Sequence, residues 1–238
     1  MSTERLMSSL LLTLVILAGS TAARAGDYTG LWTGMVTVDA VSEPSSSQPE
    51  RPTPAAGEFT FPVLLHVDDK DRITLLKEAV MLWRAGAAEG EGKYLLVADR
   101  QVLARLLSQT DGRPSGRRLS TAAYDFEGAT RVVRGDLAPG KVAWVNLDVP
   151  AKLPTNPFRH VFHPDHDNRD DAGQPLPEGK DEVFAVERRM EWKFDQAADG
   201  PELKGAYRET LTGLHRTPVQ VSGRFGLRRV ASLSTLER

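Results

Sequence analysis

The chain of 238 residues contains no cysteine and carries 30 basic against 32 acidic side chains, a formal net charge of −2. Without cysteine it can form no disulfide, no thiolate metal site and no cysteine nucleophile. The near-neutral charge argues against a nucleic-acid surface, and the length suits one domain with a sizeable core.

Residues 1–25 have the pattern of an export signal. Arg5 supplies positive charge, an apolar run follows over residues 6–18, and Ala23-Arg24-Ala25 forms a small-residue cleavage site. The apolar run is too short for a convincing membrane span. We therefore expect cleavage after Ala25, a periplasmic or secreted protein, and a mature chain of residues 26–238 that forms one β domain without a membrane span.

Alternating apolar and polar residues predict the first strands. Residues 28–40 and 58–68 alternate with a period of two, and a turn at residues 69–71 leads into a further strand at residues 72–84, so the last two segments should form a hairpin. Residues 42–57 hold four prolines and four serines and are expected to be a solvated loop. His66 falls on the second face of its strand, where we expect a packed or rim histidine and not a ligand.

One short helix is predicted in the middle of the chain. Asp99 is placed to cap it, and its apolar side consists of Leu103, Leu106 and Leu107. Strands are expected around it at residues 93–98, 117–126 and 141–149.

The C-terminal part contains three further predicted strands, at residues 182–195, 204–214 and 219–230. Two charged residues, Arg188 and Glu209, fall on the apolar faces of the first two of these strands. Because a buried charge needs a partner, we expect them to pair or to lie at a barrel mouth. Roughly nine or ten strands with one short helix favour an all-β fold, either an antiparallel β-barrel or a sandwich.

Two patterns resemble known proteins. Gly30-Leu31-Trp32 in the first strand, taken with Arg224 or Arg228 in the last strand, resembles lipocalin and avidin-like barrels, in which a first-strand tryptophan packs beside a last-strand arginine. This resemblance implies a closed barrel with an internal cavity but no particular ligand. The segments NPFRH at residues 156–160 and HPDHDN at residues 163–168 are similar to a loop of secreted bacterial β-rich proteins, and this similarity implies no activity.

A long connection at residues 150–181 contains the most unusual composition, because residues 156–171 hold three of the five histidines and four carboxylates. Neutral imidazoles are suitable ligands for zinc. However, Pro164 prevents the three histidines from lying along one regular helix, and no HExxH pattern is present. A zinc site would need ligands from outside the loop, with Glu209 as a base. The candidate metal ligands are His160, His163, His166, Asp165, Asp167 and His215.

Calcium is a second possibility, since Asp165 and Asp167 provide hard oxygen ligands. The register departs from an EF-hand loop, because Arg169 occupies the third ligand position and Asp170 the glycine position. The same residues can also hydrogen-bond one another and the backbone in a loop that binds no metal.

These observations favour a non-catalytic exported β-barrel that binds a small ligand or a cell-envelope partner. In this interpretation the His/Asp-rich loop is structural or metal-stabilised. The alternative is a metal-dependent hydrolase that uses the histidine cluster as ligands and Glu209 as its base.

Overall fold

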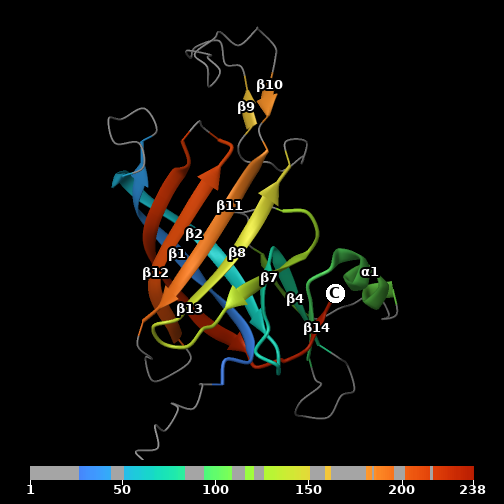
Figure 1. Ribbon diagram of the computed structural model, residues 1–238. Helices are drawn as coiled ribbons and strands as arrows, with labels where there is room; N and C mark the ends of the chain where they lie inside the picture. Colours follow the sequence, from blue (N-terminus) through green and yellow to red (C-terminus); the bar gives the residue numbers. More distant parts are fainter. Residues whose placement is uncertain are drawn as a thin grey trace, which may run out of the picture.

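A closed barrel of eight antiparallel strands forms the body of the protein (Figure 1). The computed structural model describes residues 27–43, 51–83, 94–108, 116–120, 126–150, 159–161, 181–183, 185–195, 202–214 and 217–238. Within the barrel each strand pairs with the next one along the chain, and the last pairs with the first. The barrel strands are β1 (Gly30–Ser42), β2 (Pro52–Val67), β3 (Ile73–Leu76), β7 (Thr130–Gly135), β8 (Val142–Val149), β11 (Val186–Phe194), β12 (Glu202–Thr212) and β13 (Val219–Ala231).

Alternation of apolar and polar residues produces these strands, because successive side chains point to opposite faces of a sheet. In β11, for example, Val186, Met190, Trp192 and Phe194 are buried, and the intervening residues are mostly exposed. The predicted antiparallel barrel is confirmed, and the closed hydrogen-bonding circuit decides against the sandwich.

The chain leaves the barrel between β3 and β7 to build a second sheet. The strand predicted over residues 72–84 is divided at Lys77 into β3 and β4 (Glu78–Trp83). The Lys77 ammonium donates a hydrogen bond of 2.7 Å to the carbonyl of Phe126 at this point. The second sheet has the order β14 (Leu236–Glu237), β5 (Tyr94–Val97), β4 and β6 (Gly116–Ser120).

The predicted helix is confirmed as α1 (Arg100–Ser108), which lies beside the second sheet in Figure 1. Asp99 caps it as expected, since its Oδ1 accepts hydrogen bonds from the amides of Gln101 at 2.7 Å and Val102 at 3.0 Å. In the part of the chain that the structure describes, no helix is both long and apolar enough to cross a membrane.

The second sheet packs on the outer face of the barrel. Leu31 of β1 and Leu64 of β2 point away from the barrel interior, and both are almost completely buried against Leu96 and Leu236. The last residues of the chain therefore hold the small sheet against the barrel, and β14 adds to it by pairing in parallel with β5.

Two predicted loops contain strand structure. The first, over residues 42–57, is shorter than expected because β2 already begins at Pro52. The start of β2 pairs with the end of β1, after a register shift between Val38 and Ala40. The second, over residues 150–181, contains β9 (Arg159–Val161), which pairs with β10 (Asp181–Val183) in an antiparallel ribbon. In Figure 1 this ribbon extends from the upper end of the barrel.

An arginine of the last long strand packs over the Trp32 ring at one end of the barrel, but it is neither of the two arginines predicted from the sequence. The partner of Trp32 is Arg229, whose guanidinium carbon lies 5.6 Å from the centre of the indole ring. Arg229 also donates hydrogen bonds to the carbonyls of Asp27 at 3.0 Å and Thr29 at 3.2 Å. Arg224 and Arg228 lie on the opposite face of β13, where they pair with exposed carboxylates.

Large side chains fill much of the barrel interior. Trp32, Trp192 and Tyr207 are each at most 2 % exposed. The ring of Tyr207 meets Phe61 edge-on at 5.6 Å and lies 6.0 Å from the ring of Trp192. Close aromatic packing of this kind makes the described interior a hydrophobic core, and a polar pocket lies outside it.

Candidate functional site: a polar pocket beside the barrel

Glu209 and Arg188 form the ion pair that the sequence predicted. The Arg188 Nε donates a hydrogen bond of 2.5 Å to Oε1 of Glu209, and the hydroxyl of Tyr207 donates one of 2.7 Å to Oε2. The two charged residues are 5 % and 4 % exposed. Both carboxylate oxygens therefore have donors within the barrel.

An apolar cluster lies beyond this ion pair, toward the end of the barrel that bears the β9–β10 ribbon. It consists of Val149, Val186, Leu211 and Val219. A buried charge is tolerated only when an opposite charge and hydrogen bonds compensate for the loss of water. The contacts between Arg188 and Glu209 meet this condition, so the pair has the geometry of a structural ion pair. The assignment of Glu209 as a base remains a prediction.

The predicted metal ligands fall mostly outside the described residues. This holds for His163, Asp165, His166, Asp167 and His215. His160 lies in β9, in register with Glu182 of β10. Among the described residues, no group of three or more His, Cys, Asp or Glu side chains is arranged to hold a metal ion. The zinc and calcium sites therefore remain predictions.

His66 is packed between the barrel and the C-terminal segment, residues 232–238. It lies in β2 and is 2 % exposed, in agreement with the expectation of a packed histidine. Its Nε2 is 2.9 Å from the carbonyl of Leu233. Because a carbonyl can only accept, Nε2 carries the proton, and Nδ1 of the neutral ring is an acceptor.

Burial is the main reason why the pKa of His66 is lowered. The hydrogen bond to Leu233 and the charge of Asp68 act in the opposite direction, and the charge of Arg238 adds to the lowering. Since a buried imidazolium is poorly solvated, the ring is neutral at pH 7.

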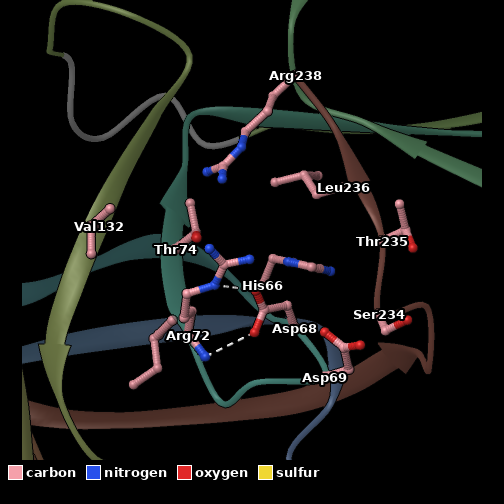
Figure 2. A pocket seen from close by; sticks show the side chains of 11 residues that line it. His66, Asp68, Asp69, Arg72, Thr74, Val132, Ser234, Thr235, Leu236 and Arg238 are labelled. Atoms are coloured by element: carbon pink, nitrogen blue, oxygen red, sulfur yellow. Dashed lines mark hydrogen bonds and ion pairs between the residues drawn. The ribbon is translucent and has the colours of Figure 1, made fainter.

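Beside His66 lies a polar cavity of about 240 Å³, which we call the side pocket (Figure 2). Its lining comes from three parts of the chain: the β2–β3 hairpin, β7 and the C-terminal segment. The residues that define it are His66, Asp68, Asp69, Arg72, Ile73, Thr74, Val132 and Arg238, together with residues 234–236.

The turn between β2 and β3 fixes one wall of the side pocket. Oδ1 of Asp68 accepts hydrogen bonds from the amides of Lys70 at 2.9 Å and Arg72 at 3.0 Å, and Oδ2 accepts one of 2.6 Å from the Arg72 guanidinium. Asp71 completes the turn with a positive φ of 58°. Burial acts to raise the pKa of Asp68, but these hydrogen bonds outweigh it and hold the pKa below its usual value.

Two largely buried polar residues, Thr74 and His66, line the side pocket. Thr74 is 6 % exposed, and in the described part of the chain its hydroxyl makes no hydrogen bond. In Figure 2 this hydroxyl is directed into the cavity, toward Arg72 and His66. The Nδ1 of His66 likewise has no hydrogen-bond partner among the described residues. Because both residues line the cavity, these atoms are available to a ligand or to water.

Sequence reasoning identified the packing of His66 but not the pocket around it. Thr74 and His66 are partners across the β2–β3 hairpin, so their proximity follows from the predicted hairpin. Residues 234–238 lie far away in the sequence and reach the pocket only because β14 pairs with β5. No local pattern signals that contact.

The fold places this chain in the class of eight-stranded, up-and-down antiparallel β-barrels, with a small second sheet on its outer face. Neither a scan of protein-family models nor a search of curated proteins found a match for it.

Proposed function

We propose that this protein is an exported, non-catalytic β-barrel binding module that takes a small polar ligand in the side pocket. The observation that carries the proposal is that two largely buried residues, Thr74 and His66, line one cavity and each keep a polar side-chain atom, the hydroxyl and Nδ1, that makes no hydrogen bond among the described residues. The export signal at residues 1–25 and a structural or metal-stabilised loop at residues 150–181 belong to the same proposal.

The size of the cavity supports a small ligand. A volume of about 240 Å³ corresponds to about eight water molecules at ~30 Å³ each. Pockets for drug-sized ligands have volumes of about 300–1,000 Å³. A compact polar metabolite suits the side pocket better than a lipid or another long apolar molecule.

The packed interior supports a site outside the barrel. The rings of Phe61, Trp192 and Tyr207 occupy space that a carrier of the lipocalin type would leave for its ligand. The side pocket instead lies between the outer surface of β2, β3 and β7 and the C-terminal segment.

Two matched variants test whether the side pocket binds ligands. Val132 borders the pocket and is 67 % exposed, whereas Val142 on the neighbouring strand is 40 % exposed and lies outside it. We expect Val132→Trp to obstruct the pocket mouth without disturbing the core, and Val142→Trp to leave the pocket open.

The measurement is a fragment screen by NMR on untagged protein, with small polar fragments of positive, negative and no charge. Fragments that bind should shift the signals of His66, Thr74 and residues 234–236 in the original protein and in Val142→Trp, but not in Val132→Trp. If fragments of every charge leave those signals unchanged, the side pocket is not a binding site and the proposed function is wrong.

A further inference from the structure

The charges around the side pocket indicate which kind of ligand it binds. Four of its lining side chains are ionised: Asp68, Asp69, Arg72 and Arg238. Asp68 and Arg72 are paired at 2.6 Å and largely compensate each other. Among the described residues, no ion pair engages the guanidinium of Arg238. One cationic group is therefore available to a ligand.

The positions of the remaining charges separate the two ends of the pocket. In Figure 2 the guanidinium of Arg238 is directed toward Thr74, whereas the carboxylate of Asp69 lies at the opposite end, below Ser234. Asp69 is exposed in the turn between β2 and β3, where water screens its charge. An anionic group is thus favoured at the end formed by Arg238 and Thr74.

Both side chains at this end can donate hydrogen bonds to an anion. The Arg238 guanidinium and the Thr74 hydroxyl can donate to the same carboxylate, and hydrogen bonds between a guanidinium and a carboxylate are stronger than those between neutral groups. The Arg72 guanidinium lines the same cavity, and its Nε is the atom that binds Asp68.

The orientation of His66 adds a second requirement. Its Nε2 is committed to the carbonyl of Leu233, so Nδ1 is the ring nitrogen left for a ligand, and in the neutral ring this atom accepts. A carboxylate oxygen would face an acceptor there. A hydroxyl on the ligand could instead donate to Nδ1.

We propose that the side pocket binds a small hydroxylated organic anion, with the anionic group at Arg238 and Thr74 and the hydroxyl donating to Nδ1 of His66. This inference rests on the proposed function, because it names the class of ligand for the same pocket.

Four small probes separate the parts of the inference: lactate, propanoate, propane-1,2-diol and inorganic phosphate. Lactate has both groups, propanoate lacks the hydroxyl, and the diol lacks the charge. We expect lactate to bind with a dissociation constant on the order of millimolar, because a ligand of so few atoms binds weakly. Propanoate and the diol should each bind about tenfold more weakly, the effect of one hydrogen bond or one charge contact.

Matched arginine variants locate the anion. Arg238→Gln should weaken lactate binding about tenfold and leave binding of the diol unchanged. Arg228 is a surface arginine paired with Glu202 on the outer face of β13, so Arg228→Gln serves as the control and should bind lactate like the original protein.

Titrations followed by NMR at pH 7.5 and constant ionic strength distinguish the outcomes. If propanoate binds as tightly as lactate, Nδ1 of His66 does not accept a hydrogen bond from the ligand hydroxyl. If the diol binds as tightly as lactate, the pocket does not select an anionic group. A response to phosphate alone would make the pocket an inorganic-anion site. If only neutral or cationic fragments bind, this inference is wrong but the proposed function stands.

Discussion

Single residues determine how closely the barrel strands approach each other. A Cβ atom built on Gly34 would lie 1.8 Å from the carbonyl oxygen of Gly226 on the neighbouring strand. Any side chain at position 34 therefore requires β1 and β13 to move apart. Gly226 itself has open space where its Cβ would be. Glycine within a strand often marks a close approach of two backbones, and the contact at Gly34 is of this kind.

We expect Gly34→Ala to lower the free energy of unfolding by about 1–3 kcal/mol or more, the usual cost of forcing extra atoms into a packed site. Gly226→Ala on the adjacent strand should change it by less than about 1 kcal/mol, because nothing occupies the position of the new methyl group. Urea unfolding followed by tryptophan fluorescence measures both. Equal losses in the two variants would contradict the close-approach explanation.

At the scale of the elements, β11 and β12 are joined by more than their backbone hydrogen bonds. The buried ion pair between Arg188 and Glu209, with the hydroxyl of Tyr207 on the second carboxylate oxygen, connects the two strands inside the barrel. The sequence predicted this pair because a cation and an anion each fell on an apolar strand face. It did not predict Tyr207 as the third member, although Tyr207 lies two residues before Glu209 and on the same face.

We expect Glu209→Gln to lower the free energy of unfolding by about 3–5 kcal/mol, because Arg188 would remain buried without a counter-charge. The triple variant Arg188→Met, Tyr207→Phe, Glu209→Leu removes every polar member and should recover most of that loss, since apolar replacements of similar volume are well tolerated. Chemical unfolding followed by circular dichroism measures the difference. A triple variant as unstable as the single one would show that the ion pair itself provides the stability.

At the scale of the whole molecule, the second sheet and the C-terminal segment cover one side of the barrel. The contact depends on an apolar cluster around Leu31 and Leu64 and on the hydrogen bond from His66 to Leu233. His66 is the polar group at this junction whose protonation changes near neutral pH. The stability of the molecule should therefore depend on pH in a window set by this residue.

The pKa of His66 is lowered in the folded protein below its ordinary value of 6.5, so the unfolded chain binds the proton more readily. The contribution of neutral His66 to the free energy of unfolding is therefore complete above pH 6.5. It should decrease as the pH falls from 6.5 toward the lowered pKa of the folded state. The carboxylates with lowered pKa values, Asp27, Asp68 and Glu202, have ordinary values of 4.5 or below and contribute only in more acidic solution.

Unfolding in urea between pH 7.5 and 5 tests this expectation. The original protein should lose stability over that range, and His66→Gln, which retains an amide donor for the Leu233 carbonyl, should lose much less. If the two proteins show the same pH dependence, another group is responsible for it.

The sequence by itself determined most of the strands but not β7, together with the capped helix, the predicted pairing of Arg188 with Glu209 and the burial of His66. These features depend on the alternation of side chains along one strand or on residues within one helical turn, so local patterns contain them. Only the tertiary structure decided that the sheet closes into a barrel, that Arg229 is the residue on Trp32, and that residues 234–238 complete the side pocket. Each of those contacts joins segments far apart in the chain, and β-strand pairing between distant segments depends on the register and curvature of the whole sheet.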